Sequence, residues 1–266
     1  MVRGVCAALA AMVVTAAPGA WAGPADLAPH RAIYAMGLAS TKPGSGIAAA
    51  SGTMSYQFED SCDGWLVENR IAVTYAYTEG GQALSATDFI TWESKDGLHY
   101  RFRMRNTRDG QVTEEVEGQA DLKGKGLGGV ARFSRPEPMS MPLPKGTLFP
   151  TEHTLRLIDA AQAGGRSFWR VVFDGSGLDG PYEVNALIGK QSQSLPSKLM
   201  SPLLGAPYWP MHLAFFPVSS PEEVPNFEMS LAYHPNGVAQ EIVQTFKSFS
   251  LRGKLESVET VPRRGG

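Results

Sequence analysis

The sequence predicts a mainly β fold made of antiparallel hairpins, with one amphipathic helix. Apolar and polar residues alternate with a period of two in one segment after another. Turn signals rich in Gly, Asn and Asp separate these segments, and one stretch combines a helix start, good helix formers and a glycine stop. Strands of the same character lie on both sides of two proline-rich loops, 136–150 and 196–210, so residues 23–266 are expected to form a single domain.

The first 22 residues have the features of a signal peptide. Met1-Val2-Arg3 is a short basic start, 5–17 is an apolar run and Ala20-Trp21-Ala22 is a small-residue cleavage site. The apolar run is shorter than the roughly 20 residues that a membrane-spanning helix needs. We therefore expect export and cleavage after Ala22, which also removes Cys6.

Two segments near the start of the mature chain predict a β-hairpin. In 53–58 the residues Met54, Tyr56 and Phe58 share one face, and the alternation resumes from Trp65 to Tyr77. Asp63-Gly64 supplies the turn, which places Cys62 at the tip of the hairpin.

A second hairpin joins 98–105 to 111–121 and carries a row of arginines. A three-residue loop, 108–110, would place Phe102 opposite Val116, whereas a two-residue loop would place it opposite Glu117. Because a one-residue slip exchanges the two faces, the sequence favours the three-residue loop.

The same register would place Arg103 opposite Glu115 and Arg101 opposite Glu117. The arginine row is either an anion-binding stripe or a solvated ladder neutralised by the facing glutamates. The ladder is favoured, with each exposed pair adding at most about 1 kcal/mol.

Further strands are predicted at 168–173, 182–188, 227–233, 238–246 and 249–255. One segment differs: 151–163 follows Phe149-Pro150 and precedes Gly164-Gly165. Leu155 and Ile158 lie on one face of the helix that this segment predicts, so the helix should pack on the sheet.

Charge and motifs exclude several classes of function. The chain has 24 Lys and Arg against 26 Asp and Glu, which gives no reason to expect nucleic acid or an anionic membrane as a partner. Residues 124–129 match G-x-G-x-x-G by letter, but 130–136 looks like a strand rather than the helix that a dinucleotide needs. Residues 174–180 lack the full ligand spacing of a calcium loop and predict a hairpin turn. The five histidines have no metal-ligand spacing, so no cofactor or metal is expected.

Nothing in the sequence indicates an enzyme. The G-x-S-x-G signature of many serine hydrolases is missing. Cys62 is surrounded by Glu59, Asp60 and Asp63, which disfavour the reactive thiolate.

Aromatic residues are the remaining candidates for binding. They lie in or beside predicted strands, and an apolar run, 213–217, follows the second proline-rich loop. They either line a ligand cavity of a curled sheet or fill the core, and the core is favoured. The candidate ligand or partner surface comprises Trp65, Arg101, Arg103, Trp169, Trp209, Phe215 and Phe216.

Short motifs in a fixed order along the chain resemble those of the EipB-like cell-envelope-integrity family. The motifs are 27–34 (LAPHRAIY), 52–54 (GTM), 62–65 (CDGW), 148–153 (LFPTEH), 173–176 (FDGS), 233–238 (YHPNGV) and 251–255 (LRGKL).

The resemblance implies a periplasmic protein whose strands form an open, spiralled barrel with one helix. It implies a role in envelope integrity rather than catalysis, exerted by docking to another periplasmic envelope protein, with tetratricopeptide-repeat proteins as one candidate class. Because this architecture is similar to that of lipid and lipoprotein carriers, the alternative is a carrier or sensor that holds a lipid or an acyl chain in the curled sheet.

The resemblance also bears on Cys62. Family members typically pair the cysteine at this position with a second one near the carboxyl end, but 261–266 contains none. The chain lacks a tie that would contribute about 2–4 kcal/mol in the chain-entropy model. Cys62 is then either a buried, inert thiol, which is favoured, or half of an intermolecular disulfide.

Overall fold

A computed structural model describes residues 25–193, 199–219 and 224–263. The expected signal peptide, Cys6 and the cleavage site after Ala22 lie outside these residues. The described residues form fourteen strands, one α-helix and one short 3₁₀ turn. The strands are β1 His30–Thr41, β2 Ile47–Asp60, β3 Gly64–Tyr77, β4 Gln82–Ser94, β5 His99–Arg108, β6 Gln111–Leu122, β7 Gly129–Arg135, β8 Met139–Leu143, β9 Ser167–Val172, β10 Tyr182–Ile188, β11 Trp209–Pro217, β12 Phe227–Tyr233, β13 Ala239–Thr245 and β14 Phe249–Thr260. The helix α1 spans Pro150–Gln162, and η1 spans Pro202–Leu204.

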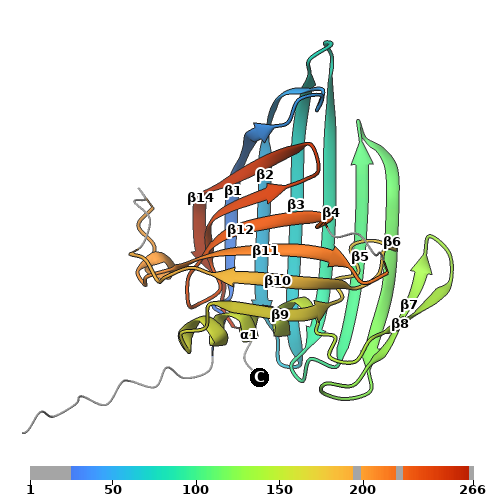
Figure 1. Ribbon diagram of the computed structural model, residues 1–266, viewed down its shortest axis with the longest axis vertical. Coiled ribbons are helices and arrows are strands. Elements are labelled where there is room, and N and C mark those ends of the chain that lie inside the picture. The colour runs from blue at the N-terminus through green and yellow to red at the C-terminus, as the bar shows by residue number, and fades with distance from the viewer. Residues whose placement is uncertain (1–24, 194–198, 220–223, 264–266) are drawn as a thin grey trace, which may run out of the picture.

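All fourteen strands belong to one antiparallel sheet, as the sequence predicts. Their order is β8-β7-β6-β5-β4-β3-β2-β1-β14-β13-β12-β11-β10-β9, so β1 and β14 join two runs of sequential hairpins. The sheet curls until β9–β12 cross the long strands β2–β4 (Figure 1). β8 and β9 are its two edges, and the sheet does not close between them. The isolated bridge between Leu148 and Val172 links the segment after β8 to β9.

The helix α1 lies beside β9 and on the inner face of the curled sheet (Figure 1). Leu157 packs with the buried side chains of β10–β12, and Ile158 packs with Leu27 and Phe58. The helix stops where Gly164 adopts a φ of 81°, in the left-handed region that favours glycine. The helix predicted at 151–163 is therefore confirmed to within one residue at each end.

An aromatic cluster holds the two ends of the sheet together. Tyr100 stacks on Phe149 with ring centroids 4.9 Å apart, and Phe102 contacts Phe133 and Phe173 edge to face. These five side chains are buried and come from β5, β7, the residue before α1 and the residue after β9. The inner face of β5 thus buries its alternate residues against the opposite edge of the sheet.

The register predicted for the arginine hairpin is wrong by two residues. The turn has two residues, Asp109 and Gly110, both with positive φ, and a bulge follows it in β6. Phe102 consequently lies opposite Gly118, and Arg103 opposite Glu117. The extra residue in the bulge keeps Phe102 on the inner face. The sequence predicts the same face for Phe102, but by means of a three-residue loop in place of a two-residue turn and a bulge.

The predicted turns are found in the structure, whereas one predicted loop contains a strand. The first hairpin, with Cys62 in the turn between β2 and β3, is confirmed. So are the strand expected after the glycines of 124–129, which is β7, and the turn at 174–180, which joins the paired strands β9 and β10. The proline-rich segment 136–150 was expected to be a loop but contains β8, an edge strand where prolines are tolerated.

Candidate functional site

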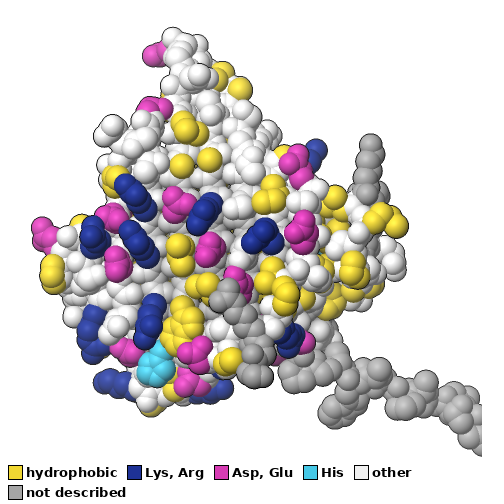
Figure 2. All heavy atoms as spheres, turned by 180° about the vertical axis from the view of Figure 1, so that it is seen from behind, with side chains coloured by type: hydrophobic (Ala, Val, Ile, Leu, Met, Phe, Trp, Pro, Cys, Tyr) yellow, Lys and Arg dark blue, Asp and Glu magenta, His cyan; other side chains and the backbone are white. Residues whose placement is uncertain are grey.

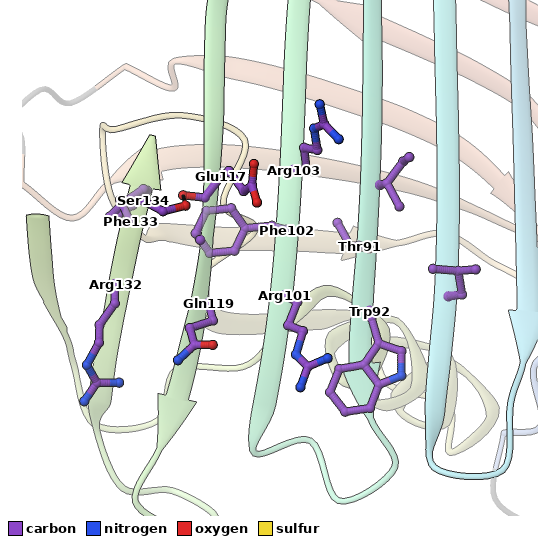
Figure 3. Close-up of a pocket in the computed structure, with 13 residues that line it drawn as sticks. Thr91, Trp92, Arg101, Phe102, Arg103, Glu117, Gln119, Arg132, Phe133 and Ser134 are labelled. Atoms are coloured by element: carbon purple, nitrogen blue, oxygen red, sulfur yellow. Dashed lines mark hydrogen bonds between the residues drawn. The ribbon is translucent and has the colours of Figure 1, made fainter. Parts of the chain in front are cut away.

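The outer face of the long strands carries an open groove of about 470 Å³, which we call the arginine groove. Its lining residues come from β3 to β7, and the exposed side chains among them, such as Arg101, Arg103 and Arg132, lie on the outer face (Figure 3). Strand alternation accounts for this, because Arg101 and Arg103 are exposed while Tyr100, Phe102 and Met104 are buried. The sequence identified these arginines, and the groove is where they lie.

Strand register aligns five groove residues in a row across five strands. Leu66 lies opposite Trp92, Trp92 opposite Arg101, Arg101 opposite Gln119, and Gln119 opposite Arg132. Figure 3 shows Trp92 and Arg101 next to each other, with Gln119 and Arg132 on the neighbouring strands. One end of the row is therefore apolar and aromatic, and the other end is polar and basic.

Arg101 is the distinctive residue of this row. Its guanidinium lies 5.1 Å from the centroid of the Trp92 ring, in the range of a cation–π contact. Among the described residues it forms no ion pair within 4.0 Å, so its charge and donors face the groove. A planar guanidinium on an aromatic ring is well suited to bind a carboxylate.

The other groove arginines have acidic neighbours. Arg132 lies 2.9 Å from Asp121, and Arg103 lies 3.6 Å from Glu115. Arg135, which follows the groove residue Ser134 on β7, lies 2.6 Å from Glu115. The solvated ladder favoured by the sequence thus describes Arg103, although its acidic partner is diagonal rather than directly opposite. It does not describe Arg101.

The charges on this side of the molecule are mixed in sign. Figure 2 shows basic side chains interspersed with acidic and apolar ones rather than a continuous basic patch. This pattern agrees with the near balance of charges in the sequence. What distinguishes Arg101 on this surface is therefore its local contact with Trp92 and not a surrounding basic patch.

The aromatic members of the candidate surface do not converge on the arginine groove. Trp65 is half-buried on the inner face beside Phe58 and Ile158, with Lys95 Nζ 4.5 Å from its ring. Trp209 is buried in the core formed by β9–β13 and α1, and Phe215 packs against that core while stacking on Phe227. These three residues confirm the core interpretation that the sequence favoured.

Trp169 and Phe216 lie elsewhere. Trp169 is 48% exposed on β9, on the side opposite its neighbour Phe168, which packs on the core. Phe216 is half-buried and alternates with Phe215, so it faces outward on β11. Neither contributes to the wall of the arginine groove.

Cys62 is exposed in the turn between β2 and β3, so the expectation of a buried thiol is wrong. It is the only cysteine among the described residues, which therefore hold no pair that could form a disulfide. The carboxyl-terminal segment nevertheless reaches this turn. Arg263 lies 2.6 Å from Asp26 and 3.7 Å from Asp60, two residues before Cys62.

Sequence reasoning missed one buried charged group, Glu93 of β4. Its carboxylate accepts hydrogen bonds from the backbone N–H groups of Thr151 and Glu152, at 2.7 and 2.8 Å. It thereby caps α1, whose own N-cap residue, Phe149, has no capping side chain. Burial raises the pKa of Glu93 to about 7, against the lowering effect of the two amide hydrogen bonds.

No group of three or more His, Cys, Asp or Glu in the described ranges is arranged to hold a metal ion. No helix in the same ranges is long and apolar enough to cross a membrane.

Comparison with known proteins matches this chain along almost its whole length. The family model described as EipB-like matches residues 21–262. The cell envelope integrity protein EipB of Brucella abortus (strain 2308) is 31% identical over 240 residues, which cover 88% of this chain and 84% of that protein. A crystal structure of a β-barrel-like protein of a domain of unknown function, also from Brucella abortus, superposes with a TM-score of 0.84 at 30% identity, covering 90% of this chain and all of that one. The chain belongs to the EipB-like family.

Proposed function

We propose that this protein maintains the integrity of the cell envelope from the periplasm, as a non-enzymatic docking scaffold. The similarity to the cell envelope integrity protein EipB of Brucella abortus supports the envelope role, and the signal-peptide features of residues 1–22 support the location. The observation that carries the docking mechanism is Arg101, which lies on Trp92 in an open groove and forms no ion pair within 4.0 Å with any described residue.

The groove fits an acidic, extended segment of a partner protein. A carboxylate of the partner would bind Arg101, and an apolar side chain next to it would contact Trp92 and Leu66. The partner is an envelope protein of the periplasm, and proteins with tetratricopeptide repeats are the candidate class that the family resemblance implies.

The alternative, a carrier for a lipid or an acyl chain, has less support, because the cavity on the inner face of the sheet is small. Sites for drug-sized ligands have volumes of about 300–1,000 Å³. The cavity on the inner face of the sheet measures about 180 Å³, and α1 occupies the space beside it. A long acyl chain would have to displace α1 and break the hydrogen bonds to Glu93.

The decisive experiment compares Arg101→Glu with Arg105→Glu, a matched control. Arg105 is exposed on the same face of the same strand but does not line the groove. We expect Arg101→Glu to lose at least tenfold of partner crosslinking in intact cells and to become sensitive to detergent, because it presents a negative charge to an acidic segment. Arg105→Glu should behave as the unmodified protein.

Equal crosslinking and equal detergent resistance in the two variants would contradict docking through this groove. A titration of the purified protein with a lipid or acylated peptide separates the two candidate functions. Stoichiometric binding of an acyl chain would favour the carrier, and its absence would leave the scaffold.

A further inference from the structure

A second cavity, on the inner face of the sheet, has the features of a binding site. It measures about 180 Å³ and lies between the amino end of α1 and strands β1–β5, with β12 on its far side. We call it the inner cavity. It is distinct from the arginine groove, which occupies the outer face of the same long strands.

The walls of the inner cavity are largely aromatic and deeply buried. His30, Phe58 and Tyr100 are each at most 3% exposed. Tyr56 and Tyr233 keep some accessible surface, yet burial raises the pKa of both. This combination is expected of side chains that line an internal space rather than the outer surface of the protein.

One polar atom at the wall lacks a partner. The Oδ1 atom of Asn69, on β3, is buried and accepts no hydrogen bond from any described residue. Buried acceptors of this kind are rare, because the group loses its bond to water on folding and gains none. A molecule in the inner cavity with an O–H or N–H donor would supply the missing bond.

Electrostatics restricts the charge of such a molecule. None of the described residues that line the inner cavity is a Lys, Arg, Asp or Glu. Burial lowers the pKa of His30, which keeps the imidazole neutral, and it raises the pKa of the tyrosines, which keeps the phenols protonated. A charged ligand would have no counter-charge in the inner cavity, so the site selects neutral molecules.

Volume restricts the size. An apolar cavity of about 150 Å³ in another protein holds one benzene molecule. The inner cavity therefore has room for one six-membered ring with a small substituent, and it is too small for an acyl chain.

From these observations we infer that the inner cavity binds a small, uncharged ring compound that donates a hydrogen bond to Asn69. Phenol is the simplest probe of this class, since its ring fits the volume and its hydroxyl is the donor. Toluene is the matched probe without a donor.

The test uses the full mature chain and four combinations of protein and probe. Binding of phenol and of toluene is measured by calorimetry for the unmodified protein and for Asn69→Leu, which keeps the size of the side chain but removes the acceptor. We expect phenol to bind about tenfold more weakly to Asn69→Leu, while toluene binds the two proteins equally. Glu68→Gln, on the outer face of the same strand, serves as the control and should bind both probes as the unmodified protein does.

Nuclear Overhauser contacts give a second readout that needs no variant. Phenol protons should contact the methyl groups of Leu27 and Val67 in the unmodified protein. Absence of saturable phenol binding, which would mean that the inner cavity holds solvent only, would overturn the proposal. So would phenol binding that is equal in Asn69→Leu, or phenol contacts that map to another part of the protein.

Discussion

At the scale of single residues, two buried ionisable side chains at the amino end of α1 make the stability of the protein change with pH in opposite directions. Burial raises the pKa of Glu93 from 4.5 to about 7, and burial next to Arg170 lowers the pKa of His153 from 6.5 to about 4. Glu93 therefore contributes stability that is complete below pH 4.5 and is lost as the pH rises to 7. His153 contributes stability that is present above pH 6.5 and is lost as the pH falls to 4.

The two pH dependences nearly cancel between pH 4.5 and 6.5, where the native state holds a proton on Glu93 and the unfolded state holds one on His153. Each is on the order of 3 kcal/mol over its window, at about 1.4 kcal/mol per pKa unit. Removal of one group should expose the effect of the other. We expect the free energy of unfolding to rise with pH in Glu93→Gln, and to fall with pH in His153→Phe, relative to the unmodified protein.

Urea unfolding at pH 4.5, 5.5, 6.5 and 7.5 checks this, with the difference between each variant and the unmodified protein as the measured quantity. Groups common to all three proteins, such as His30, cancel in that difference. Parallel curves for the three proteins would contradict the assigned pKa shifts.

The sequence does not reveal that Glu93 and His153 lie together at the amino end of α1. Glu93 belongs to a strand, and its carboxylate caps a helix that begins far along the chain, so no capping motif next to the helix reveals it. The helix itself was predictable, because Pro150 and Gly164 mark its ends locally. Local signals locate elements, whereas this cap depends on how the sheet curls around the helix.

At the scale of elements, strand register decides which side chains form the arginine groove. The alternation in β5 correctly predicted that Arg101 and Arg103 face outward. The bulges in β6 and β7 then decided their neighbours, and alternation alone does not report a bulge. The contact of Trp92 with Arg101 depends on the pairing of β4 with β5, which alternation within either strand does not report.

Gly118 gives a test of this register. It lies at the bulge between β6 and β7, and a Cβ atom there would lie 2.4 Å from the carbonyl oxygen of Arg132 and 2.7 Å from Phe102 Cζ. Since the carbonyl belongs to the backbone of a paired strand, relief requires β6 and β7 to separate. We expect Gly118→Ala to lower the free energy of unfolding by about 1–3 kcal/mol.

Gly37→Ala is the control for this change, because Gly37 also lies in a strand and its Cβ would meet its nearest atom at 3.9 Å. It should change the free energy of unfolding by less than about 0.5 kcal/mol. Similar losses in the two variants, measured by urea unfolding, would indicate a general cost of alanine in these strands rather than a collision at the bulge.

At the scale of the whole molecule, the sheet depends on one long-range pairing. The sequence predicted a strand at 249–255 but not its partner, because alternation identifies a face and says nothing about distant neighbours. In the structure β14 pairs with β1 from His30–Thr260 to Thr41–Phe249 and with β13 on its other edge. β14 thus connects the run β1–β8 to the run β9–β13, and the arginine groove and the core around Trp209 lie on opposite sides of it.

This topology predicts that the two runs do not fold independently. Without β14, the inner face of β1 would lose the cover of Leu251, and the aromatic cluster that joins β5 and β7 to Phe173 would have to hold the molecule together alone. We expect a chain ending at Ser248 to lose cooperative unfolding and to be degraded along its whole length by a dilute protease.

A chain ending at Thr260 is the control. Among the described residues it loses the ion pairs of Arg263 with Asp26 and Asp60 and the hydrogen bond that the Val261 N–H donates to the Pro29 carbonyl. Each of these contributes about 1 kcal/mol, so the chain should still unfold cooperatively. A protease-resistant fragment spanning β1–β8 in the shorter chain would contradict this, because it would mean that the strands bearing the arginine groove form a domain without the rest of the sheet.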